Sequence, residues 1–139
     1  VFNRRRFVKG EIMKKILLLS FISLFGYTEP RLYFIEPAND SEHKESVHIK
    51  FGLQDFGVAP AGLDYPNSGH HHLIINAPLP DLTLPIPADF NYRHFGAGQT
   101  EAEVKLAPGT YKLQLLLGNY LHIPHQEALY SDVITITVE

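Results

Sequence analysis

The feature that most constrains the fold of this chain is the alternation of apolar and polar side chains that begins after residue 30. It is clearest in residues 47–53 and 110–117, where an apolar side chain recurs at every second position. Side chains of a β-strand point alternately to its two faces, so this period is typical of strands with one buried face. No segment after residue 30 shows the 3.6-residue period of an amphipathic helix. The pattern therefore predicts an all-β domain.

Six strands are predicted, and residues that favour turns separate them. Such strands bury a common core when two sheets pack face to face. We therefore predict an antiparallel β-sandwich of immunoglobulin or cupredoxin type over residues 30–139. The predicted strands are residues 31–35, 47–53, 71–76, 99–106, 110–117 and 133–138.

Two of the predicted connections are unusually long for a small domain. They comprise residues 54–69 and 77–98, and both contain several prolines. Long loops within a compact domain are usually either functional or disordered. Because proline fixes the backbone angle φ, we expect these two loops to be ordered and to have a defined shape.

The N-terminal segment resembles an export signal. Met13, Lys14 and Lys15 precede an apolar run at residues 16–25. A charged start followed by roughly ten apolar residues is typical of a signal peptide, and the run is shorter than the ~20 residues that span a bilayer. We expect residues 1–29 to be an upstream extension plus a removed signal peptide, and residues 30–139 to be periplasmic or secreted with no stable membrane span. An N-terminal anchor or a buried helix is the alternative.

Charge and composition exclude several classes of function. From residue 16 onward the chain carries 6 basic and 14 acidic residues, a net charge of −8 with histidine neutral. Such an acidic domain repels phosphate backbones, so nucleic acid is not an expected partner. The chain has no cysteine, and its only methionine is Met13. Disulfides, thiolate metal sites and cysteine-held iron–sulfur clusters are therefore excluded.

Six of the eight histidines fall in three short segments, which is the strongest functional signal of the chain. Imidazole is the commonest metal ligand, and two histidines at positions i and i+2 of a strand share one face. His70 and His72 are therefore expected on one face and His71 on the other. Pro124 stiffens the segment between His122 and His125, which lowers the entropy that is lost when these rings bind a ligand. We predict a site for a divalent transition metal, copper(II) or zinc, at the strand ends and loops, with the ligands His70, His72, His94, His122 and His125.

Two loop carboxylates, Asp64 and Asp89, could add oxygen ligands to such a site. Arg93 beside His94 would equally suit an anion, because arginine offers a planar fork of donors. His43 and His48 are interpreted as surface histidines. A metal held by imidazoles should be released between about pH 7 and pH 5, because protons compete for the same nitrogens.

A second hypothesis assigns the same histidines a structural role. They would form a hydrogen-bonded network that shapes the loops for a periplasmic protein or a cell-envelope glycan partner, together with Asn67, Asn91, Tyr92 and Arg93. Rings that converge on a common point would favour the metal, whereas rings that each pair with a carbonyl would favour the network.

Catalysis has little support in the sequence, and no catalytic residue is predicted. The chain has no Gly-x-Ser-x-Gly elbow, no His-Glu-x-x-His motif and no phosphate-binding loop. A copper-dependent redox or dismutase-like activity is a third reading, and it would need an open coordination position. The sequence favours a binding module over an enzyme.

Several motifs, read in order, resemble one known family. They lie at residues 57–62, 67–75, 85–89, 94–100 and 115–125, and they include Gly69-His70-His71-His72. Together they are similar to the bacterial DUF4399 family of unknown function, over nearly all of residues 32–138. The resemblance implies a small exported or periplasmic domain with no established activity.

Overall fold

The computed structural model describes residue 26 and residues 28–139. The apolar run predicted to be a signal peptide therefore lies outside the described residues. Within the described part of the chain, no helix is both long and apolar enough to cross a membrane.

Over these residues the chain forms β-strands and no helix, which confirms the predicted all-β class. All six predicted strands are present. Three short strands, β2, β4 and β6, were not predicted, because two to four residues are too few to show an alternation. The strands are β1 (Arg31–Glu36), β2 (Ser41–His43), β3 (Ser46–Gln54), β4 (Gly57–Val58), β5 (Ser68–Ile75), β6 (Tyr92–Phe95), β7 (Glu101–Lys105), β8 (Gly109–Gly118) and β9 (Ile134–Val138).

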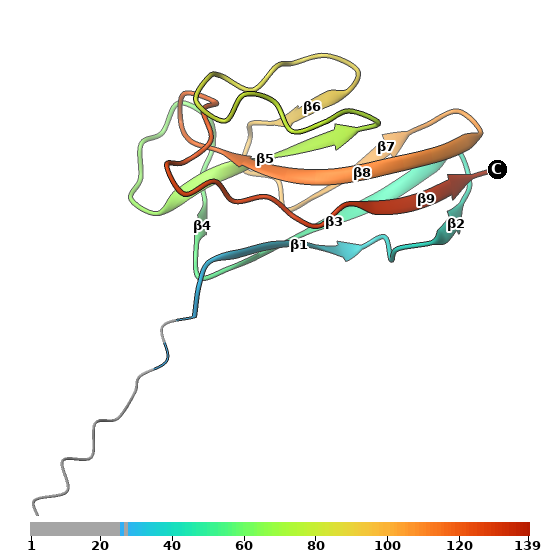
Figure 1. The fold of residues 1–139 in the computed structure, drawn as a ribbon, viewed down its shortest axis with the longest axis horizontal. Coiled ribbons are helices and arrows are strands. Elements are labelled where there is room, and N and C mark those ends of the chain that lie inside the picture. The colour runs from blue at the N-terminus through green and yellow to red at the C-terminus, as the bar shows by residue number, and fades with distance from the viewer. Residues whose placement is uncertain (1–25, 27) are drawn as a thin grey trace, which may run out of the picture.

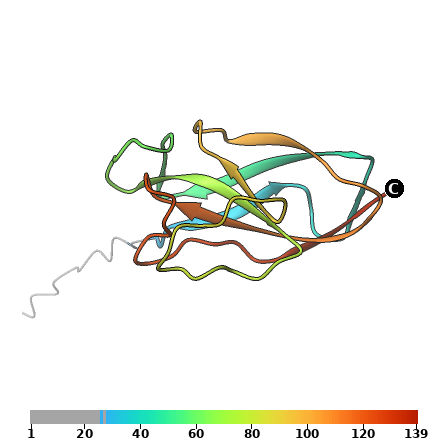
Figure 2. The ribbon, with the colours of Figure 1, turned by 90° about the horizontal axis from the view of Figure 1, so that it is seen from above.

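The strands form two sheets that lie face to face and run roughly along the long axis of the molecule (Figure 1, Figure 2). The smaller sheet has the order β1-β3-β7 and is antiparallel. The larger one has the order β2-β9-β8-β5-β4, and β6 pairs with β5 on the same side as β4. Two short pairs at its edges, β2 with β9 and β4 with β5, are parallel. The larger sheet is therefore mixed at its edges, while the pairs of β5 with β6, β5 with β8 and β8 with β9 are antiparallel as predicted.

The main core lies between the two sheets and contains the apolar residues of the alternating pattern. Each strand contributes every second side chain, because successive residues face opposite sides. Burial of these aliphatic side chains supplies the main stabilisation of a domain without disulfides. The core residues include Val47, Ile49 and Phe51 of β3, Leu73 and Ile75 of β5, and Leu113, Leu115 and Leu117 of β8.

A second, smaller apolar cluster lies on the outer face of the larger sheet. Ile74 of β5 and Leu116 of β8 pack there against Ile86. Ile86 belongs to the proline-rich connection between β5 and β6, which lies on the side of β5 and β8 opposite β1 and β3 (Figure 1). Side-chain hydrogen bonds at Asp81 and Asp89 fold this connection into turns. The long loop therefore covers the outer face of β5, and this covering is what buries the histidines on that face.

Candidate functional site: a histidine cluster on the outer face of β5

The three consecutive histidines of β5 face alternate sides of the sheet, as predicted. His71 points into the main core, where its ring stacks on Phe51 with centroids 4.6 Å apart and an interplanar angle of 24°. His70 and His72 point to the opposite, outer face. All three side chains are buried, with exposed fractions of 0%, 0% and 1% for His70, His71 and His72.

Strand β6 brings a third imidazole to the outer face. In the antiparallel pairing of β5 with β6, His94 lies directly opposite His72. Directly opposed residues of neighbouring strands share a face, so both rings lie on the same side. Arg93, the preceding residue, is turned elsewhere: its guanidinium lies over the Phe90 ring at 4.8 Å, and its Nε donates to the Phe90 carbonyl. The Arg93 side chain therefore interacts with Phe90 of its own loop.

A tight turn after β8 supplies the fourth imidazole, from His122. The Oδ1 of Asn119 accepts hydrogen bonds from the amides of Leu121 and Ile123, and the His122 amide donates to the Asn119 carbonyl. His122 has a φ of 63°, a left-handed conformation that is uncommon for a residue other than glycine. The Ile86 amide donates to the His122 carbonyl, which ties the covering loop to this turn. Such strained positions are concentrated at functional sites.

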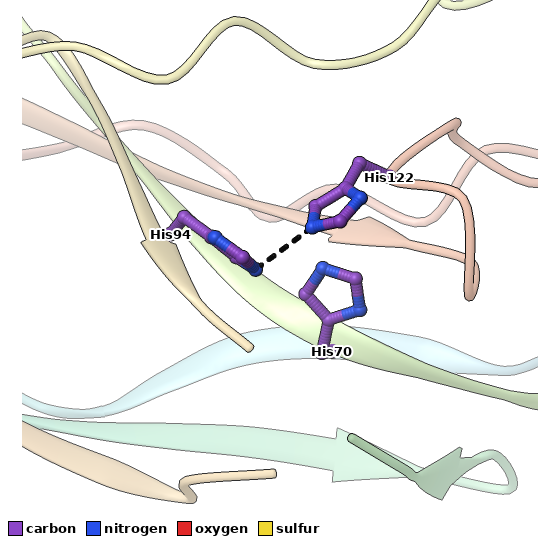
Figure 3. A group of neighbouring side chains, drawn as sticks. All are labelled: His70, His94 and His122. Carbon is purple, nitrogen blue, oxygen red and sulfur yellow. Dashed lines mark hydrogen bonds between the residues drawn. The ribbon is translucent and has the colours of Figure 1, made fainter. Parts of the chain in front are cut away.

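The four rings of His70, His72, His94 and His122 form one group, which we call the histidine cluster. One ring nitrogen each of His70, His94 and His122 lies within 4.8 Å of the other two. The Nε2 atoms of His94 and His122 are 3.1 Å apart, and a nitrogen of His70 lies beside them (Figure 3). His70 is fully buried, His122 is half-buried and His94 is exposed, so the cluster is reached from solvent on the His94 side.

Two glycines make room for the cluster. A Cβ atom at Gly118, which lies opposite His70 in the pairing of β5 with β8, would stand 2.7 Å from the His72 Cε1 atom. A Cβ atom at Gly96 would overlap the His94 ring. Any other residue at either position would push an imidazole out of its place. Sequence alone does not reveal this role, because it depends on which ring lies above each glycine.

The buried imidazoles lack hydrogen-bond partners to an unusual degree. Among the described residues, both ring nitrogens of His70 and the Nδ1 of His72 are buried with no partner. A buried polar group left unpaired costs roughly 1–3 kcal/mol, so most such groups are paired in native proteins. Under the second hypothesis each ring should donate its one N–H group to a backbone carbonyl. That arrangement is not found at His70.

Burial and crowding keep His70, His72 and His94 uncharged. Burial, followed by the nearby His94 and His122, lowers the pKa of His70 to about 4. Burial, followed by the neighbouring His70, lowers the pKa of His72 to about 3. The pKa of His94 is also lowered, first by burial and then by His122. These three rings are neutral at pH 7, and neutral imidazole is the form that binds metals.

The remaining predicted ligand, His125, lies apart from the cluster. Its Nε2 is hydrogen bonded to the Ser68 carbonyl at 2.9 Å, and its ring packs edge-on against Phe56. A Cβ atom at Gly69 would stand only 2.9 Å from the Cε1 atom of the His125 ring. Gly69 precedes His70 in β5, so His125 faces the side of the strand that His70 does not. The sequence placed His122 and His125 together, but the Ile123-Pro124 spacing separates their rings.

The other residues that the sequence singled out serve local structure. The carboxylate of Asp89 accepts hydrogen bonds from the amides of Asn91 and Tyr92, and Asp64 is exposed. The Asn91 side chain donates to the Ile75 carbonyl, and the Tyr92 hydroxyl donates to the Pro78 carbonyl. These bonds belong to the loop network of the second hypothesis. They position the covering loop without involving the cluster.

His43 and His48 lie away from the cluster, and Asn67 adopts a turn conformation. His48 is hydrogen bonded to Glu101 at 2.8 Å and lies 3.4 Å from Glu36, in a group of surface charges on the smaller sheet. His43 is hydrogen bonded to Ser41 at 2.7 Å. Asn67 has a φ of 51° just before β5. None of these three residues contributes a nitrogen to the cluster.

Comparison with known proteins identifies the family. The model of the family described as "Domain of unknown function (DUF4399)" matches residues 49–139, so the chain belongs to this family, as predicted. The match includes every member of the histidine cluster. No curated protein matches the chain.

One solved structure is similar to the chain in part. It is the X-ray structure of the endo-β-1,4-mannanase from Thermotoga petrophila, with a TM-score of 0.47 and 16% sequence identity. The similar region covers 81% of this chain and 20% of that chain. The chain therefore spans about a fifth of the length of that enzyme chain.

Proposed function

We propose that this chain is an exported binding module for a divalent transition metal, zinc or copper(II). The metal would be held by the outer-face imidazoles, and His70, His94 and His122 would provide the first three ligands. The observation that carries the proposal is that three ring nitrogens from three segments lie within 4.8 Å of one another. The exported location is an expectation from the predicted signal peptide.

The chemistry of the donors supports this class of ligand. Imidazole nitrogens suit zinc, copper and nickel, whereas magnesium and calcium prefer oxygen ligands. A metal would also satisfy one of the two ring nitrogens of His70 that are buried without a partner. An anion would need protonated histidines, and the lowered pKa values of His70, His72 and His94 disfavour that form near neutral pH.

Calorimetric titration of the full chain, produced without a histidine tag, tests the proposal. With zinc or copper(II) at pH 7 we expect one equivalent to bind with a Kd below about 1 µM. The variants His70→Ala and His122→Ala should weaken binding by at least about 100-fold each, since each removes a ligand. His48→Ala is the matched control, because it also removes one histidine but leaves the cluster intact, and its affinity should equal that of the parent.

Two results would contradict the proposal. The first is a Kd weaker than about 10 µM for both metals. The second is tight binding that persists unchanged in His70→Ala and His122→Ala, because the metal would then be bound elsewhere.

A further inference from the structure

The arrangement of all four rings in the histidine cluster carries information about coordination geometry. The ring centroids are 4.5 Å apart for His94 and His122, 4.7 Å for His70 and His72, and 4.8 Å for His70 and His122. They are 4.9 Å apart for His70 and His94, and 5.1 Å for His72 and His94. The last pair, His72 and His122, is 6.1 Å apart.

These distances approximate the edges of a tetrahedron. With Zn–N bonds of about 2.0–2.1 Å, each centroid of a bound imidazole lies about 3.2 Å from the metal, and four tetrahedral centroids are then about 5.2 Å apart. Five of the six observed distances lie between 4.5 and 5.1 Å. The ring centroids therefore approximate four corners, with the pair His72 and His122 farther apart than the ideal.

A square-planar arrangement fits the same distances poorly. If four imidazoles surround a copper(II)-type centre in a square, the ring centroids across each of the two diagonals are about 6.4 Å apart. The pair His72 and His122 approaches this value at 6.1 Å. The complementary pair, His70 and His94, is only 4.9 Å apart. The cluster thus lacks the second long diagonal.

We propose that His72 is the fourth ligand and closes a tetrahedral, four-imidazole site that is suited to zinc rather than to square-planar metals. This inference rests on the proposed metal-binding function and deepens it. It requires a nitrogen of His72 to turn towards the centre that the other three rings share.

The surroundings of His72 support its assignment. Its ring is 1% exposed, and its Nδ1 has no partner among the described residues. His72 also lies directly opposite His94 in the strand pairing, so the backbone fixes their separation. Gly118 leaves the space that the ring occupies. These features describe a buried polar side chain beside the other three rings, with an Nδ1 that lacks a partner.

A closed site of this kind has a functional consequence. Catalytic zinc sites keep one coordination position for water or substrate, whereas four protein ligands leave none. The bound zinc would be retained rather than used in catalysis. It would also fasten β6 and the turn at residues 119–123 to β5, because the four ligands come from these three segments.

X-ray absorption at the zinc edge of the zinc-loaded full chain counts the imidazoles directly. We expect four nitrogen ligands at about 2.0–2.1 Å in the parent protein. In His72→Gln, which keeps a polar side chain of similar length, we expect three imidazoles and a weakening of zinc binding by at least about 100-fold. His125→Gln is the matched control and should keep all four. Far-UV circular dichroism checks that each variant is folded.

A second measurement on the unmutated protein does not depend on the folding of any variant. Titration with cobalt(II) should give the intense visible absorption of a tetrahedral complex, whereas five- or six-coordinate cobalt absorbs weakly. Weak cobalt bands, or three imidazoles plus a water in the zinc spectrum, would overturn the role of His72 while zinc binding itself remained. Absence of zinc binding in calorimetry would overturn the proposed function and this inference together.

Discussion

The two faces of strand β5 use the same residue type for different purposes. On the inner face His71 lies between aliphatic side chains and stacks on Phe51, with no second imidazole in contact. On the outer face His70 and His72 lie beside His94 and His122, with ring centroids 4.7–6.1 Å apart. The difference shows that the face of the strand, and not the residue type, decides whether a histidine is available for binding.

The unpaired nitrogens sharpen this contrast. His70 and His71 each bury two ring nitrogens without a partner in the described residues. Such groups oppose folding by roughly 1–3 kcal/mol each. On the outer face a metal can compensate for this cost, since it binds the nitrogen directly. On the inner face, only the packing of the His71 ring against its neighbours can offset the cost of burying its nitrogens.

The largest expected difference concerns the stability provided by the two faces. Leu115 and Leu116 are adjacent in β8 and both 0% exposed, but Leu115 belongs to the main core and Leu116 to the small outer cluster. Replacement of a buried leucine by alanine costs about 2–5 kcal/mol, and less where the surroundings can collapse. We expect Leu115→Ala near the upper end and Leu116→Ala near the lower end, as measured by urea unfolding. Equal losses would show that the covering loop forms as rigid a core as the two sheets do.

The second prediction concerns acid stability, measured on metal-free protein with a chelator present. Burial lowers the pKa of His71 to about 4, whereas in the unfolded chain it is about 6.5. Below about pH 6.5 the unfolded chain therefore binds a proton at His71 that the folded chain does not, so the contribution of His71 to stability falls until about pH 4 and then levels off. His71 alone should account for a loss of roughly 3 kcal/mol.

The variant His71→Phe isolates this contribution, because it keeps a ring against Phe51 and removes the titrating group. Urea unfolding of both proteins at pH 7, 6, 5 and 4 should show a smaller acid loss in the variant. The same pH dependence in both proteins would mean that His71 becomes protonated without unfolding the core.

The third prediction separates the two faces by metal affinity. His70→Gln should weaken zinc binding by at least about 100-fold, which corresponds to about 2.7 kcal/mol, because a ligand is lost. His71 is adjacent to His70 in sequence, but its side chain points into the main core. The zinc affinity of the variant His71→Phe should therefore stay within about threefold of the parent. A comparable loss in both variants would refute the assignment of binding to one face.

The smallest effect is expected at His125. Its Nε2 is already hydrogen bonded to the Ser68 carbonyl, and its ring lies against Phe56. We expect His125→Ala to change zinc affinity by less than about threefold, in the same calorimetric titration. A larger decrease would show that His125 is a metal ligand, as the sequence predicts.

The lowered pKa values of the buried rings move the expected release of a metal to lower pH than the sequence predicts. An ordinary histidine pKa predicted release of the metal between about pH 7 and pH 5. Because burial lowers the pKa of His70 to about 4 and of His72 to about 3, competition from protons at these rings begins at lower pH. Protons compete with the metal only at a pH at which the imidazole nitrogen binds a proton.

The strands of the main core could be predicted from sequence because their alternation is local. In β3 and β8 every second residue is apolar, and the structure buries those residues except Leu53 and Tyr111, which are half-buried. The strand pairs at the edges of the larger sheet could not be predicted. β2 and β4 have three and two residues, and their parallel partners lie elsewhere in the chain. Pairing between such short segments depends on the packed sheet and not on their own sequence.

The site could be predicted in part for the same reason. Strand periodicity correctly placed His70 and His72 on one face. The positions of His94 and His122 relative to them depend on the pairing of β6 with β5 and on the turn that Asn119 holds. The separation of His125 from His122 also depends on the contacts of His125 with Ser68 and Phe56, which sequence spacing does not reveal.

Anomalous diffraction at the zinc edge would show whether the outer-face imidazoles bind one metal ion. Crystals of the zinc-loaded full chain, grown without a histidine tag, should show one strong anomalous peak about 2.0–2.1 Å from ring nitrogens of His70, His94 and His122. No peak should lie beside His71. Zinc-loaded crystals with no anomalous peak among these three rings, or with a peak only at His125 or at surface carboxylates, would contradict the account.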